Sequence, residues 1–150
     1  MTDRLRQPAY ALHALVAVLD RGADSILREH LGITYNRFLT LLTLQRLGSA
    51  TQRELATELG VSEPSVSRSL PTLTEAGYLT VTSTAGEGNR RQVELTAVGD
   101  KVVNEAADLL EDGFAQVMKR AGVKAGQILD VTGPMLGALD VGPNETGGTP

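Results

Sequence analysis

The chain has 150 residues and a mass of 15.9 kDa, with 41% hydrophobic and 21% charged residues, which predicts one globular domain. Fourteen Lys and Arg residues against eighteen Asp and Glu residues give a formal net charge of −4, which argues against a protein that coats nucleic acid or an anionic membrane. A local basic site is compatible with this balance. Because the chain has no cysteine, disulfides, thiolate zinc sites, cysteine nucleophiles and thiol-based redox sensing are excluded for it.

The first seven residues are polar with no apolar stretch behind them, and no segment approaches the ~18 consecutive apolar residues that span a bilayer. We therefore expect a cytoplasmic protein without membrane contact.

Aromatic residues make up only 3% of the chain, so the core is expected to consist of Leu, Val, Ile and Ala. The spacing of apolar residues predicts a first helix over about residues 8–30. Thr34 is a suitable cap for a second helix that Gly48 ends, and this helix is apolar nearly all round and expected to be buried. Its apolar residues are Phe38, Leu39, Leu42 and Leu47.

The next segment predicts two short helices joined by a three-residue turn. A Thr-x-x-Glu capping box opens the first helix at Thr51, and this helix ends at Leu59. Ser62 caps the second helix, Pro64 lies in its first turn, and Gly77 ends it. This arrangement indicates a helix-turn-helix.

A β-hairpin is predicted immediately afterwards, because residues 78–83 and 92–95 alternate between apolar and polar around a Gly-rich turn at 86–89. A helix-turn-helix followed by a hairpin is a winged helix, whose tip can reach the DNA backbone or the minor groove.

Two more helices complete the predicted fold. Thr96 opens a long helix to about residue 121, where Gly122 breaks it. A last helix covers about residues 124–139, with Gly133 and Pro134 interrupting it, and residues 141–150 are expected to form a disordered tail.

On a helical wheel, residues 62–76 form a core-facing stripe of Val66, Leu70 and Leu73. The opposite face holds Pro64, Ser65, Ser67, Arg68, Pro71 and Thr72. Hydroxyls on this face can bind phosphates, and a guanidinium can bind a guanine edge in the major groove. The alternative is an ordinary solvated helix face. Pro71 removes the helical bond to the Ser67 carbonyl, so we expect a kinked or shortened helix, at a cost of about 3 kcal/mol.

With its elements in this order, the chain resembles the MarR (multiple antibiotic resistance regulator) family of bacterial transcription regulators over about residues 8–140. The resemblance is carried by residues 51–56, 59–62, 66–68, 70, 73, 76–79, 89–91, 95, 96 and 99. It implies a homodimer that binds palindromic double-stranded operator DNA and, as in many members, releases it when a small aromatic or phenolic ligand binds. The expected fold class is mainly α with a small β-hairpin: dimerisation helices at about 8–48 and 97–140, and a winged helix-turn-helix at 49–96.

The candidate DNA-binding residues are Thr51, Gln52, Ser62, Pro64, Ser65, Ser67, Arg68, Thr72, Asn89, Arg90 and Arg91. The candidate ligand-binding residues are Tyr10, His13, Phe38 and Arg46, with a core or dimer-interface role as the alternative for His13. No catalytic residues, metal or cofactor are expected, because the two histidines and the glycines form no enzyme motif.

Three features depart from the family pattern. Asn89 stands where an Asp usually precedes the arginine pair, so a bracing ion pair is lost, and the strand after Arg91 is shorter than usual, which makes the reach of the wing uncertain. The third feature is Pro71.

Residues 51–100 hold four Arg against seven acidic residues, a local charge of −3, whereas DNA-binding domains are typically basic. This balance keeps two other functions open: a winged-helix module that binds protein, and a small-molecule-binding protein without a DNA function.

Overall fold

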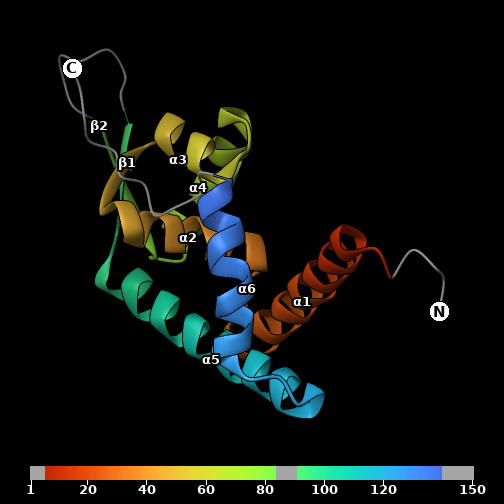
Figure 1. Ribbon diagram of the computed structural model, residues 1–150. Helices are drawn as coiled ribbons and strands as arrows, with labels where there is room; N and C mark the ends of the chain where they lie inside the picture. Colours follow the sequence, from red (N-terminus) through yellow and green to blue (C-terminus); the bar gives the residue numbers. More distant parts are fainter. Residues whose placement is uncertain (1–5, 84–90, 140–150) are drawn as a thin grey trace. The chain divides into compact units, whose positions relative to one another are not determined.

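The computed structural model describes residues 6–83 and 91–139. Its contacts divide the chain into two compact units, Met1–Glu111 and Asp112–Pro150. The elements of the first unit are α1 (Pro8–Leu31), α2 (Tyr35–Leu47), β1 (Ser49–Thr51), α3 (Gln52–Leu59), α4 (Glu63–Glu75), β2 (Leu79–Ser83), β3 (Arg91–Leu95) and the start of α5 (Ala97–Ala121) (Figure 1). This order confirms the mainly helical, winged fold. The predicted wing tip at 86–89 and tail at 141–150 lie outside the described residues.

The sheet has three antiparallel strands in the order β1-β3-β2, where the sequence predicted a two-stranded hairpin. Val93 in the central strand pairs with Ala50 on one side and Val81 on the other. The additional strand, β1, has only three residues, too few for an alternating pattern to reveal it. The amide of Gln92 donates to the Ser49 hydroxyl at 2.5 Å, so side chains as well as backbone hold β1 in place.

The core of the first unit contains aliphatic side chains from almost every element, with Phe38 as its buried aromatic residue. Its members are Leu27, Ile33, Phe38, Leu41, Leu44, Ala50, Leu55, Ala56, Val66, Leu70, Leu73, Leu79, Val93, Val103 and Ala106. The expectation that α2 is buried nearly all round is wrong. Leu41 and Leu44 are fully buried, but Leu42 and Leu47 are exposed because one face of α2 has no partner element within this unit.

The junction between α1 and α2 depends on one carboxylate. Asp24 accepts a hydrogen bond from the backbone N–H of Tyr35 at 2.9 Å and one from Arg28 Nε at 2.6 Å. The N–H belongs to the first residue of α2, where no intrahelical acceptor exists. These two bonds lower the pKa of Asp24 below its ordinary value, and the bond from the Tyr35 backbone has the larger effect.

The junction between the sheet and α5 leaves no space for a side chain. Thr96 donates its N–H to the Tyr78 carbonyl at 3.0 Å and its hydroxyl to the Gly77 carbonyl at 2.5 Å. The same hydroxyl caps α5 by accepting from Gly99 N–H at 3.0 Å, as the sequence predicted for Thr96. A Cβ on Gly99 would lie 1.9 Å from the Tyr78 carbonyl oxygen.

The second unit contains the end of α5 and α6 (Ala125–Ala138). Gly122, at φ 68°, follows α5 as predicted. The predicted interruption at Gly133 and Pro134 is wrong, because α6 continues through both residues. Proline removes one N–H donor, and on an exposed helix water can bind the carbonyl that has lost its partner.

Gly99→Ala is expected to lower the free energy of unfolding by about 2–3 kcal/mol, because the added methyl meets a backbone carbonyl that cannot rotate away. Gly22→Ala in α1 is the matched control: nothing lies within 4 Å of its Cβ position, and a gain of about 0.5–1 kcal/mol is expected there. Urea denaturation of both variants checks this. Similar changes in the two variants would contradict the close packing at Gly99.

The Asp24 contact should make stability depend on pH. Because its folded pKa is lowered, its stabilisation is fully present above the unfolded pKa of about 3.9 and is lost as pH falls through the folded pKa. The difference in unfolding free energy between wild type and Asp24→Asn should therefore be largest near neutral pH and disappear in strong acid. Arg28→Ala should reproduce only the smaller part of this pH-dependent difference, because it leaves the hydrogen bond from Tyr35 N–H to Asp24 intact. A pH-independent difference for Asp24→Asn would refute this account.

Candidate nucleic-acid interface

Two short helices, α3 and α4, form the helix-turn-helix, and side chains fix both of their starts. Thr51 accepts from Glu54 N–H at 3.2 Å while the Glu54 carboxylate accepts from Thr51 N–H at 2.7 Å, which confirms the predicted capping box. Gly60 ends α3 at φ 66°, and Ser62 then caps α4 by accepting from Ser65 N–H at 3.3 Å. The turn between the helices is therefore closely determined by local sequence.

The two faces of α4 match the helical wheel. Val66, Leu70 and Leu73 are buried, at 1–3% exposure. Ser67, Arg68 and the other predicted residues of the opposite face are exposed, except Ser65, which is half-buried. The Arg68 guanidinium reaches back to the Ser65 hydroxyl at 3.4 Å, so this side chain lies along the surface of the helix.

Pro71 does not shorten α4, which continues through it to Glu75, so the expected shortening is wrong. The buried Leu70 and Leu73 hold the helix against the core on both sides of the proline. Proline also has a fixed φ that suits a helix, so only one hydrogen bond is lost.

Residues predicted to bind DNA meet on one flank of α4. Gln52 at the start of α3, Ser67 and Pro71 on α4, and Arg91 at the start of β3 line a single open pocket of about 400 Å³. Thr51, the cap of α3, precedes Gln52 in the sequence and is half-buried. Thr72 is exposed on α4. Asn89 and Arg90 lie outside the described residues.

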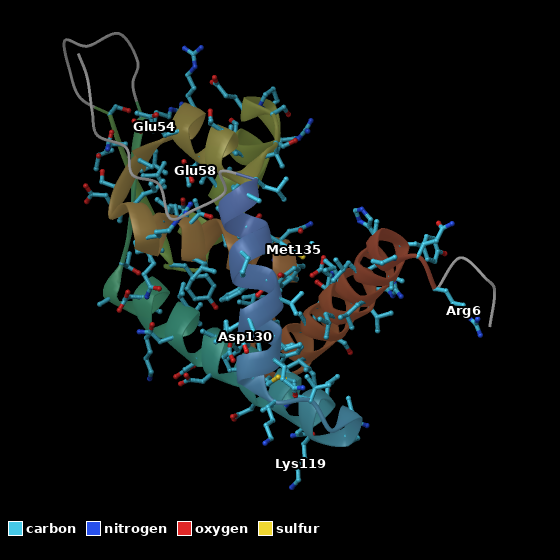
Figure 2. All side chains as sticks on the ribbon, in the orientation of Figure 1. Arg6, Glu54, Glu58, Lys119, Asp130 and Met135 are labelled. Atoms are coloured by element: carbon cyan, nitrogen blue, oxygen red, sulfur yellow. The ribbon has the colours of Figure 1, made fainter. Side chains whose placement is uncertain are left out.

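Two arginines near this surface are engaged with acids. Arg46 pairs with Glu58 of α3 at 2.5 Å, and Arg53 pairs with Glu63 of α4 at 3.8 Å (Glu54 and Glu58 are labelled in Figure 2). In the described part of the interface, Arg68 and Arg91 have no ion pair within 4.0 Å. These two are therefore the cations best placed to contact a phosphate or a base.

The four predicted ligand-binding residues do not line any of the three described pockets. Tyr10 and His13 are exposed on α1, Phe38 is buried against Tyr35 with ring centroids 6.2 Å apart, and Arg46 is paired with Glu58.

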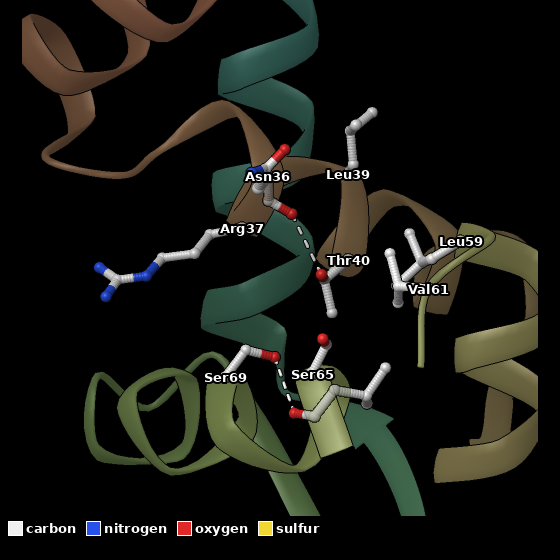
Figure 3. Close-up of a pocket in the computed structure, with 9 residues that line it drawn as sticks. Asn36, Arg37, Leu39, Thr40, Leu59, Val61, Ser65 and Ser69 are labelled. Carbon is white, nitrogen blue, oxygen red and sulfur yellow. Dashed lines mark hydrogen bonds between the residues drawn. The ribbon is translucent and has the colours of Figure 1, made fainter. Parts of the chain in front are cut away.

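A second pocket, of about 370 Å³, lies between α2 and α4 and was missed by the sequence (Figure 3). Its lining residues are Asn36, Arg37, Leu39, Thr40, Leu59, Val61, Ser65, Val66 and Ser69. We call it the α2–α4 pocket. The sequence contains one signal of this pocket, because Thr40 is a polar residue in an apolar helix. In the structure Thr40 is buried and its hydroxyl donates to the Asn36 carbonyl at 3.1 Å.

Within residues 6–83 and 91–139, no cluster of three or more His, Asp or Glu side chains is arranged to hold a metal ion. No helix in these ranges is long and apolar enough to cross a membrane.

The chain matches the family model described as MarR family over residues 31–92. Among solved structures, it is similar to apo MarR from E. coli, with 20% identity and a TM-score of 0.76 over 88% of this chain and 96% of that one. It is also similar to the transcriptional regulator MosR of M. tuberculosis in complex with DNA, with 25% identity and a TM-score of 0.61 over 89% and 97% of the two chains.

NadR in complex with 4-hydroxyphenylacetate is similar at 19% identity, with a TM-score of 0.68 over 93% of this chain and 95% of that one. The helix order and the three-stranded sheet are thus shared with these structures over almost their full length, and residues 31–92 of the chain match the MarR family model.

Proposed function

We propose that the protein is a DNA-binding transcriptional regulator, a homodimeric repressor that places one α4 in each of two major grooves of a palindromic operator. The observation that carries this proposal is the surface of α4: exposed hydroxyls and Arg68 opposite a buried apolar stripe, with Gln52 and Arg91 on its flank. This combination of hydrogen-bonding groups suits base edges and phosphates. The similar MosR structure contains DNA.

The dimer is supported by apolar surface that a single chain leaves in water. On α1 the exposed apolar residues are Tyr10, Leu12, Leu15, Val16 and Val18. On α6 they are Leu129, Val131, Met135, Leu136 and Leu139 (Met135 is labelled in Figure 2). Soluble monomers rarely expose continuous apolar faces of this kind, so a second copy is the expected cover. The dimerisation segments are residues 8–48 and 97–140.

Within each half-site, Arg68 and Arg91 have different proposed roles. Arg68 lies on the face of α4 opposite the buried stripe and reads a base, since a guanidinium can bind guanine O6 and N7 together. Arg91 lies at the start of β3 and anchors the protein on phosphate, together with Asn89 and Arg90, which precede it in the sequence.

We also propose that a small aromatic acid controls DNA binding through the α2–α4 pocket. Leu39, Leu59 and Val61 in its lining suit an aromatic ring, and Arg37, whose guanidinium points away from Leu59 and Val61 in Figure 3, is the lining cation that can turn toward a bound carboxylate. Since α4 forms part of this pocket, a bound ligand contacts the recognition helix directly. The similar NadR structure holds a phenolic acid.

Selection from a random-sequence duplex library tests the DNA function and defines an operator. Arg68→Ala should then cost about 1–3 kcal/mol per half-site on that operator and little on random DNA. Arg91→Ala should weaken all sequences alike and reduce the slope of log K against log salt by about 1 per wing, about 2 per dimer. Arg21→Ala, an exposed arginine of α1, is the control.

Sedimentation of the same samples should give about twice the 15.9-kDa chain mass, as for a homodimer. A monomer that binds no duplex at any salt concentration would leave the protein-binding module or small-molecule carrier as the function.

Ligand control is tested with salicylate and 4-hydroxyphenylacetate as probes. At millimolar concentration one of them should raise the melting temperature by mass action and weaken operator binding. Arg37→Ala should remove both effects, while Arg21→Ala retains them, and the uncharged amide of the same acid should be inactive. An equal response from Arg37→Ala would show that the acid binds elsewhere.

A further inference from the structure

Proline inside α4 changes the hydrogen bonding of one backbone carbonyl. In a helix the carbonyl of residue i accepts from the N–H of residue i+4, and Pro71 has no N–H, so Ser67 loses its helical donor. Two neighbouring carbonyls accept additional bonds instead: Ser69 donates to Val66 and Thr74 donates to Leu70, both at 2.8 Å. No described side chain donates to the Ser67 carbonyl.

The helix around this carbonyl is continuous. Capping at Ser62 and burial of Leu70 and Leu73 keep α4 continuous from Glu63 to Glu75. Proline is unfavourable in a helix interior relative to alanine, and this proline lies on the exposed side of α4. The consequence is a backbone acceptor without its helical donor, carried by an exposed residue of a continuous helix.

The residue that carries this acceptor lines the same pocket as other groups proposed to contact DNA. Ser67 and Pro71 are exposed and line the same open pocket as Gln52 and Arg91. The pocket gives a polar group of about the size of a base edge room to approach that flank of α4. Arg68, the next residue along the helix, is exposed beside it.

A carbonyl and a guanidinium recognise different groups on the edge of a base: the carbonyl needs a donor and the guanidinium an acceptor. In the major groove adenine and cytosine present amino groups, which donate, whereas guanine and thymine present O6 and O4, which accept. A lone carbonyl therefore prefers an amino-bearing base on the strand it faces, and it does not discriminate adenine from cytosine. Arg68, which has only donors, has the complementary preference for guanine.

We propose that the Ser67 backbone carbonyl, released by Pro71, is a specificity-determining acceptor that selects A or C over G or T at one position of each half-site. The proposal rests on the proposed DNA-binding function and adds to it a contact that no side-chain pattern predicts.

The test compares base preferences selected from a random duplex library by the full-length wild type, Pro71→Ala and Pro71→Leu. Both variants restore the N–H that occupies the Ser67 carbonyl, and the leucine keeps an apolar side chain in place of the proline ring. Pro134→Ala makes the same chemical change in α6, within the proposed dimerisation segment, and is the matched control provided that sedimentation shows an unchanged dimer. Circular dichroism and melting temperature confirm that the variants fold, which is expected because alanine and leucine favour helices.

The wild type and Pro134→Ala should show one position per half-site where A and C are selected over G and T, about fivefold, the value of one neutral hydrogen bond. Both Pro71 variants should lose that preference and keep the rest of the motif. Retention of the preference in Pro71→Leu alone would assign it to an apolar contact and overturn the proposal. Retention in both variants, or a wild-type motif without such a position, would also overturn it. If the wild type selects no motif, the DNA-binding function itself fails.

Discussion

The close approach of α5 to the turn after α4 is the contact on which the arrangement of the first unit depends. Thr96 bonds to the carbonyls of Gly77 and Tyr78, and Gly99 lies against the second of them without space for a methyl group. Those carbonyls join the end of α4 to the start of β2. The recognition helix and the wing strand are therefore both fixed to the long helix through one short segment. Arg68 and Arg91 can contact DNA in a constant geometry only if this segment is rigid.

Charge contributes less to this interface than is typical of a DNA-binding domain. Arg46 and Arg53 are paired with glutamates, and α4 carries Glu63 and Glu75 near its two ends. Phosphate contacts supply most non-specific affinity for DNA, so a surface with few unpaired cations binds random sequence weakly. In the proposed function, hydroxyls, Arg68 and the backbone then account for a larger share of the binding free energy through base edges. The net charge of −4 thus favours selectivity and does not argue against DNA binding.

Local sequence determined those features that depend on a few adjacent residues. The caps at Thr51 and Ser62 and the stripe of Val66, Leu70 and Leu73 follow from side-chain chemistry and the 3.6-residue period, and the structure has them where they were predicted. β1 escaped prediction because its partner, β3, lies more than forty residues later. The α2–α4 pocket escaped for the same reason, since its walls come from three helices that sequence spacing does not relate. The effects of Pro71 and Pro134 were overestimated, because a local rule ignores the packing and hydration that compensate for one lost bond.

In the proposed function, one flank of α4 contacts DNA and the other contacts the ligand. Ser67 and Pro71 lie on the flank shared with Gln52 and Arg91, whereas Ser65 and Ser69 lie on the flank that faces α2. A ligand in the α2–α4 pocket would therefore contact α4 through Ser65, itself a candidate DNA-binding residue, and leave Ser67, Pro71 and Arg68 free. It can change DNA affinity only if it binds one position of α4 relative to α2 better than another, because equal affinity shifts no equilibrium. Thr40 and Ser69 already donate their hydroxyls to backbone carbonyls of their own helices, so Arg37 of α2 is the lining side chain best able to make a contact that differs between such positions.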